Sequence, residues 1–161
     1  MKIITRKSLG KRKKKCDSAF TFIETLAVLA VTAILTSQIG LAAYKLLEKA
    51  RISAAQTQIQ ELKVALQAYY ADSGIFPSEE QGLMALWEEP ELYPLAKNWN
   101  GPYTDKKIHA DPWGNPFAYF TRGNAIAENI LPRGLPFGIL SYGADGKEGG
   151  QGNDKDIFSW E

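Results

Sequence analysis

The chain has very little cysteine and histidine and lacks the motifs that commonly mark a catalytic site or a disulfide framework. Among 161 residues there is one cysteine, Cys16, and one histidine. A single thiol cannot build a disulfide framework. The sequence also shows no Ser/His/Asp grouping, no phosphate-binding glycine loop and no zinc-ligand spacing. The chain is therefore not expected to be an enzyme.

The small net charge of +1 conceals an uneven distribution. Residues 1–19 hold eight Lys or Arg and one Asp, a net of +7, so the remainder carries −6. The run Lys11–Lys15 is compatible with a nucleic-acid-binding arm. It stands just before a long apolar stretch, however, and cationic residues that flank a membrane segment stay on the cytoplasmic side. This context favours an orienting role, with the C-terminus outward and no nucleic-acid partner.

Residues 20–44, FTFIETLAVLAVTAILTSQIGLAAY, form an apolar segment with one charge, Glu24. As a helix with a rise of about 1.5 Å per residue, it could cross a hydrocarbon core roughly 30 Å thick. A secretory signal is cut after its apolar run, whereas here the small residues Ser18 and Ala19 come before it. We predict that a leader, 1–19, is removed and that a transmembrane helix, 20–44, stays on the mature chain.

Glu24 is chemically unusual in this segment, because a carboxylate inside a membrane helix costs on the order of 3 kcal/mol and usually has a partner. Two interpretations stay open. The carboxylate could lie at the membrane edge, hydrated among headgroups. Alternatively, cleavage before Phe20 would create an α-amino group that pairs with Glu24, most usefully on a neighbouring subunit.

Residues 45–71 continue the helix with strong helix formers and become amphipathic. Their apolar stripe could be a coiled-coil seam, or it could lie against the chain's own globular domain, which its short length favours. Asp72-Ser73-Gly74 is a typical helix end. The stripe consists of Ile52, Ala55, Ile59, Leu62, Leu66 and Tyr69.

Residues 72–161 are rich in Gly, Pro, Asn and aromatics, which is typical of a globular domain with short elements. Ser78 is a candidate N-cap for a short helix that buries Leu83, Leu86 and Trp87. Trp113, between two prolines, is expected to pack in a turn. Short antiparallel strands are expected near 117–121, 125–131 and 137–142. Together these features predict an α+β domain in which the long helix lies against a small antiparallel sheet.

The C-terminal stretch places four acidic residues among five glycines. Hard cations such as Ca²⁺ bind carboxylate and carbonyl oxygens, but Lys147 and Gly149 stand where an EF-hand needs Asp or Asn. From the chemistry of the residues alone, two interpretations stay open: a flexible acidic loop and a calcium site. The flexible loop is the favoured one. The four residues are Asp145, Glu148, Asp154 and Asp156.

The junction Ala19/Phe20-Thr-Phe-Ile-Glu24, after a basic leader, resembles the class III signal of type IV pilins and type II secretion pseudopilins. The resemblance implies that a prepilin peptidase cuts between Ala19 and Phe20 and N-methylates Phe20. It also implies that Glu24 registers each subunit against its neighbour during assembly. Two features depart from the pattern: Ala19 replaces the usual Gly, and the proline that relatives often carry in this helix is absent, although Gly40 stands nearby.

Three later segments, GIFPSEEQGLMAL, DPWGNPF and LSYGADGKEGGQGNDKDIFSW, resemble in this order the major pseudopilins of type II secretion, the general secretion pathway protein G family. The resemblance implies a type IV pilin-like fold and one Ca²⁺ per subunit in the C-terminal loop. Its implied ligands are the side chains of Asp145, Asp154 and Asp156, with backbone oxygens near Leu140 and Glu148.

The function implied is that of a structural subunit of a periplasmic pseudopilus, which polymerises to drive folded proteins across the outer membrane. The implied location is the inner membrane, as a single-pass protein with a cytoplasmic leader and a periplasmic C-terminal domain, and after assembly the pseudopilus. Implied partners are further copies in a helical homopolymer, the prepilin peptidase, minor pseudopilins, the inner-membrane assembly platform and membrane lipid. The alternatives are a type IV or competence pilin, which usually has a cysteine-bridged loop, and a membrane-anchored periplasmic module that never assembles.

Overall fold

The computed structural model describes residues 20–108, 110–122 and 129–161, with only the backbone over 38–42. The predicted leader, with Ala19, lies outside the described residues. The chain divides into two compact units, Met1–Leu41 and Ala42–Glu161.

One long helix, α1, spans Phe22–Ser73, close to the predicted limits of Phe20 and about Ala71. It ends at the predicted Asp-Ser-Gly sequence, where the Gly74 amide donates to the Tyr70 carbonyl at 2.8 Å. In the first unit the large apolar side chains of α1 are exposed, among them Phe22 and Leu29. Among the described helices, none has a stretch long and apolar enough to cross a membrane. The transmembrane span over residues 20–44 stays a prediction.

The core of the second unit forms on the apolar stripe of α1. Ile59, Leu66 and Tyr69 are almost completely buried, as are Ala55 and Leu62. They pack against buried residues that come later in the chain, including Leu86 and Ile139. The stripe is therefore the inner face of the chain's own domain, as its short length favoured.

The short helix after Ser78 is a 3₁₀ helix, η1, over Gly82–Leu86. The Ser78 and Gln81 side chains each bond the other's backbone amide, at 3.2 and 2.8 Å. This reciprocal pair has the pattern of a capping box, but the residue at the N-cap of η1 is Gln81 and not, as predicted, Ser78. Leu83 and Leu86 are buried as predicted, whereas Trp87 is only partly buried.

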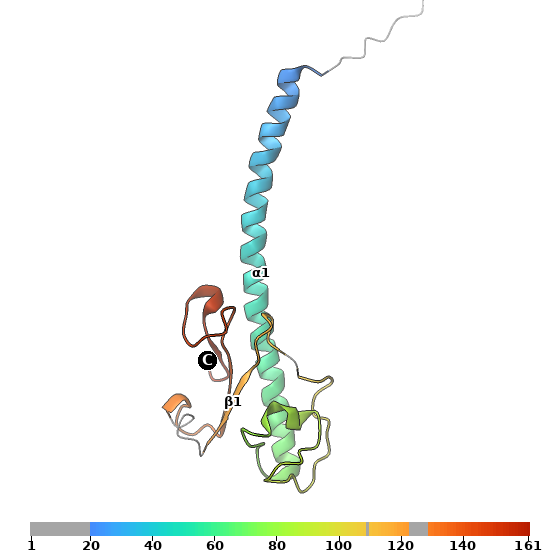
Figure 1. Cartoon of the computed structure of the whole chain (residues 1–161), viewed down its shortest axis with the longest axis vertical. Coiled ribbons are helices and arrows are strands. Elements are labelled where there is room, and N and C mark those ends of the chain that lie inside the picture. Colours follow the sequence, from blue (N-terminus) through green and yellow to red (C-terminus); the bar gives the residue numbers. More distant parts are fainter. Residues whose placement is uncertain (1–19, 109, 123–128) are drawn as a thin grey trace, which may run out of the picture. The chain divides into compact units, whose positions relative to one another are not determined.

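The sheet has three antiparallel strands in the order β1-β2-β3: Ala118–Thr121, Phe137–Ser141 and Ile157–Phe158. Ala118 pairs with Leu140, and Leu140 also pairs with Phe158, so β2 is the central strand. Figure 1 shows the sheet beside the part of α1 that belongs to the same unit. The α+β fold with a long helix and a small antiparallel sheet is confirmed.

The strand prediction was wrong in one place. Of the segment 125–131, the described Asn129 and Ile130 are helical, and residues 125–128 lie outside the described residues. The third strand is instead β3, which has two residues and follows a glycine-rich loop. A strand this short has no alternating pattern from which it could be recognised; it pairs because β2 offers a free edge.

The last residues lie firmly against the sheet and the helix. Ser159 donates its amide to the Ile139 carbonyl and accepts the Ile139 amide through its hydroxyl, at 2.9 and 3.0 Å. The Lys63 ammonium on α1 donates to the Ser159 carbonyl at 2.6 Å. Gly138 has no room for a side chain, because Leu131 and Trp160 occupy the space that a Cβ would take.

We expect Leu66→Ala to lower the free energy of unfolding of a fragment that starts at Lys45 by about 2–5 kcal/mol, because a fully buried leucine is replaced by a cavity. Val64→Ala on the same helix is the matched control, since Val64 is 65% exposed and its loss should change stability by less than about 0.5 kcal/mol. Urea unfolding of both variants measures the difference. Equal losses would show that the stripe is not the core.

Candidate functional site

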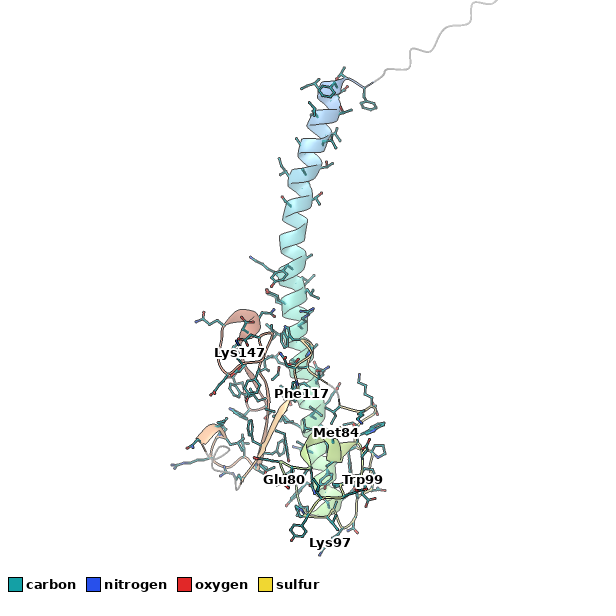
Figure 2. All side chains as sticks on the ribbon, in the orientation of Figure 1. Glu80, Met84, Lys97, Trp99, Phe117 and Lys147 are labelled. Atoms are coloured by element: carbon teal, nitrogen blue, oxygen red, sulfur yellow. The ribbon has the colours of Figure 1, made fainter. Side chains whose placement is uncertain are left out.

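The candidate site is the loop that joins β2 to β3, residues 142–156. It is built from turns and a 3₁₀ helix, η2, over Gly152–Asp154. Figure 2 shows Lys147 at the outer part of this loop. Three of the four predicted acidic residues, Asp145, Glu148 and Asp154, are exposed, whereas Asp156 is buried.

Asp156 is the unusual member of the loop because its carboxylate is buried and only half satisfied. The side chain is 6% exposed. Its Oδ2 accepts the Gly149 amide at 2.9 Å, whereas Oδ1 has no hydrogen-bond partner among the described residues. An ionised oxygen that is buried without a partner is strongly unfavourable. A cation beside Asp156 would remove that penalty.

The other predicted ligands are not drawn together around Asp156. Asp145 accepts the Lys147 amide through Oδ1 at 3.1 Å, within its own turn. Leu140 lies in β2 and is buried. Among the residues that the structure describes, no group of three or more His, Cys, Asp or Glu side chains is placed to hold a metal ion. The calcium site stays a prediction.

The pKa of Tyr142 responds to the negative charge of the loop. Burial raises the pKa of its phenol, and the carboxylates of Glu148 and Asp156 raise that pKa further. Both effects disfavour the phenolate. The Lys155 ammonium pairs with the Glu161 carboxylate at 3.1 Å, and both side chains are largely exposed.

Two glycines let the ends of the loop approach each other. Gly143 has φ +65°, and a Cβ on it would lie 2.9 Å from the Asn153 carbonyl oxygen. Gly150 has φ +97°, and a Cβ there would collide with the Asp154 carbonyl. Positive φ and close backbone contact both require glycine. The backbone at Gly143 and at Gly150 therefore passes close to the backbone of residues 153–155.

A buried aspartate that the sequence reading missed, Asp111, anchors the start of the loop. It is 5% exposed, and its Oδ1 accepts the amides of Trp113 and Asn115 at 3.0 and 2.8 Å. Its Oδ2 accepts the buried Ser141 hydroxyl at 2.6 Å. The carboxylate therefore links the Asp-Pro-Trp-Gly-Asn turn to the end of β2. Asp followed by Pro and Gly is a turn signal, and its side chain commonly bonds the backbone two residues on.

The same turn holds the loop at two further points. The Asn115 side chain donates to the Gly143 carbonyl at 2.7 Å. The Trp113 indole, which was expected to pack in the turn, donates to the Asn153 side chain at 3.1 Å. Both ends of the loop are thus fastened to one turn.

A second candidate site lies at the start of α1. Glu24 Oε2 accepts the Thr21 amide at 3.0 Å and the Thr21 hydroxyl at 3.1 Å, and the Thr21 hydroxyl accepts the Glu24 amide at 3.3 Å. This is a capping box at the beginning of the helix, and the pattern Thr-x-x-Glu could have predicted it. Phe20, at the predicted cleavage point, is 79% exposed.

Comparison with known proteins identifies the family. Residues 43–160 match the family model described as type II secretion system (T2SS), protein G. The type II secretion system core protein G of Pseudomonas aeruginosa is 37% identical, over 92% of this chain and 99% of that protein. The corresponding protein of Vibrio cholerae is 32% identical, over 92% and 95%.

A solved structure agrees with the sequence matches. The crystal structure of the major pseudopilin from the type 2 secretion system of enterohaemorrhagic Escherichia coli aligns with a TM-score of 0.55 and 26% identity. The alignment covers 70% of this chain and 88% of that one. The chain therefore belongs to the type II secretion system protein G family, a family of structural subunits and not of enzymes, which confirms the resemblance found in the sequence.

We expect Asp111→Ala to lower the free energy of unfolding by about 1.5–3 kcal/mol, because two amides and the Ser141 hydroxyl lose a charged acceptor. Asp105→Ala is the matched control, since Asp105 is an exposed aspartate outside the turn. Thermal unfolding of both variants of a fragment that starts at Lys45 measures the effect. Identical melting temperatures of the two variants would show that Asp111 does not anchor the loop.

Proposed function

We propose that this member of the type II secretion system protein G family polymerises into a periplasmic pseudopilus and drives folded proteins across the outer membrane. The match over residues 43–160 carries the proposal, because it covers both the amphipathic part of α1 and the C-terminal loop. The proposed partners are further copies of the chain, minor pseudopilins and an inner-membrane assembly platform.

The proposed starting point of assembly is a single-pass protein of the inner membrane. The leader would lie in the cytoplasm, residues 20–44 would span the bilayer, and the second unit would lie in the periplasm. The exposed apolar side chains of the first unit, such as Phe22, Ile23 and Leu29, support this. Side chains of this kind need lipid or the helices of neighbouring subunits around them.

Cleavage between Ala19 and Phe20 and N-methylation of Phe20 by a prepilin peptidase are part of the same proposal. The new amine would begin the mature chain four residues before Glu24. Both hydrogen bonds that the described residues give the Glu24 carboxylate end on Oε2. Glu24 could therefore cap its own helix with one oxygen and use the other for the N-terminal amine of a neighbouring subunit.

We also propose that the C-terminal loop binds one Ca²⁺. The buried Asp156 Oδ1 without a partner is the observation that supports this, because an ion at that oxygen would satisfy it. Asp145 and Asp154 are the other proposed carboxylate ligands, with backbone oxygens near Leu140 and Glu148. The ion would supply positive charge that holds the glycine-rich loop in one conformation.

Calcium binding has a direct test in a fragment that starts at Lys45. We expect EGTA to lower the melting temperature and added Ca²⁺ to restore it. At a concentration of Ca²⁺ a hundredfold above its Kd, the free energy of unfolding should rise by about 2.7 kcal/mol. Ca²⁺ should also lower the raised pKa of Tyr142, because it neutralises the carboxylates of Asp156 and Glu148.

The matched variants for this test are Asp156→Asn and Asp105→Asn. The first should abolish the response to EGTA, and the second should keep it, because Asp105 is exposed and lies outside the loop. Spectrophotometric titration of the tyrosines, with Tyr142→Phe as reference, measures the pKa. An unchanged melt and an unchanged titration on adding Ca²⁺ would contradict the site.

The role of Glu24 is tested in cells that carry the secretion system. We expect Glu24→Ala to be inserted and processed normally but to lose pseudopilus assembly and secretion. Glu24→Gln separates the two functions of the side chain, because its amide oxygen can still accept from Thr21 while its charge is gone. Failure of both variants would identify the charge as the essential property.

Mass spectrometry of the purified parent and variants checks processing in the same samples. N-methyl-Phe20 should be the first residue of each. Intact Met1 on the parent chain would contradict the cleavage, and full secretion by Glu24→Ala would contradict the assembly mechanism.

A further inference from the structure

A short loop after η1 is held rigidly by a buried glutamine. Gln81 is 8% exposed, and its amide nitrogen donates to the carbonyls of Leu92 and Pro94 at 2.6 and 2.8 Å. Its amide oxygen accepts the Ser78 amide at 2.8 Å. A buried amide with three hydrogen bonds fixes the backbone to which it binds. The conformation of the loop is therefore determined from inside the unit.

This fixed loop presents large apolar side chains to solvent. Leu92, Tyr93 and Leu95 are 52%, 86% and 57% exposed. Glu89 and Glu91 beside them are exposed, and neither forms an ion pair within the described part of the chain. We call residues 89–95 the acidic apolar loop. Exposed apolar groups that lie together and are bordered by charge mark interaction surfaces.

A second exposed apolar surface in the same unit has the opposite charge. On α1, Leu46 and Leu47 are 70% and 52% exposed. With 3.6 residues per turn, Lys49 falls beside Leu46 and Arg51 beside Leu47. Lys45, Lys49 and Arg51 are all exposed, and they outnumber the one acidic residue of the segment, Glu48, which is partly buried. We call residues 45–51 the basic apolar helix patch.

The two surfaces cannot meet within one copy. The acidic apolar loop lies near the end of α1, where the Tyr103 hydroxyl donates to Asp72 at 3.0 Å and the Tyr103 ring contacts Trp99. Lys97 and Trp99, labelled in Figure 2, mark this end of the helix. The helix patch lies more than twenty residues before Asp72 on α1, roughly 30–40 Å away at the rise of an α-helix.

We propose that the acidic apolar loop of one subunit docks on the basic apolar helix patch of the next. Opposite charges surround two apolar centres that are both exposed in the single chain, and such complementarity selects the partner and the register. Because the two surfaces differ, the contact is heterologous, and a heterologous contact that does not close generates an open helical filament. The proposal rests on the proposed polymerisation and adds the surfaces that carry it.

Cysteine cross-linking tests the contact in the full chain, expressed together with its secretion system. Tyr93→Cys and Leu46→Cys are introduced together into a Cys16→Ser background, which has no other thiol. A heterologous contact joins each chain to two neighbours, so oxidation should give a ladder of multimers. Each single-cysteine variant should stay monomeric, and so should Asp105→Cys combined with Leu46→Cys.

Charge reversal tests the same contact without new thiol chemistry. In the cross-linking background, Glu89→Lys with Glu91→Lys should lower the ladder yield at least about tenfold, since like charges would face each other. Lys49→Glu with Arg51→Glu should do the same, and all four changes together should restore the ladder. Lys106→Glu, at an exposed site outside both surfaces, is the matched control and should leave the ladder unchanged.

The outcomes separate this contact from the function on which it rests. Filaments that assemble while the Tyr93/Leu46 pair gives no ladder would overturn the contact and leave the pseudopilus function standing. Charge reversals that act alone but are not rescued together would also overturn it. A parent chain that stays monomeric in the presence of its secretion system would overturn the function, and the contact with it.

Discussion

Burial of one face of α1 is the interaction on which the second unit depends. The later segments are short: a five-residue 3₁₀ helix and strands of four, five and two residues. None of them could form a stable structure alone, because such elements need an apolar surface to lie against. The stripe from Ala55 to Tyr69 is that surface, and it collects residues from almost the whole length of the later chain.

Two buried polar side chains then determine the loops that the short elements leave free. Asp111 fastens the start of the C-terminal loop, and Gln81 fastens the loop that follows η1. Each sits inside the unit with its hydrogen bonds made by backbone or hydroxyl groups, so that exposed residues some distance away are held in place. Surfaces on the outside of this subunit are thus set by polar contacts within it, and this arrangement suits a protein whose function is assembly.

The features that were predictable from the sequence are those with a local pattern. The stripe has the helical period, Asp-Ser-Gly ends the helix, and the side chains of Ser78 and Gln81, three residues apart, bond each other's backbone amides. β3 and the bond from Asp111 to Ser141 were not predictable, because each joins segments far apart in the chain. In the C-terminal loop, composition pointed to acidic residues in general, and only the burial of Asp156 distinguishes one of them. The Thr21–Glu24 capping box was also predictable, because Thr-x-x-Glu is a local pattern.

The close fit at Gly138 and the hydrogen bonds of Ser159 involve the C-terminal residues, which are synthesised last. Translation delivers the apolar stripe first, and the residues that complete the sheet come last, since the bond from Lys63 to Ser159 spans 96 positions. The nascent chain therefore carries an unpartnered apolar helix for most of its synthesis. Exposed apolar surface of this kind favours aggregation until folding is complete. Early capture of the helix by a membrane or a chaperone would protect the subunit during that interval.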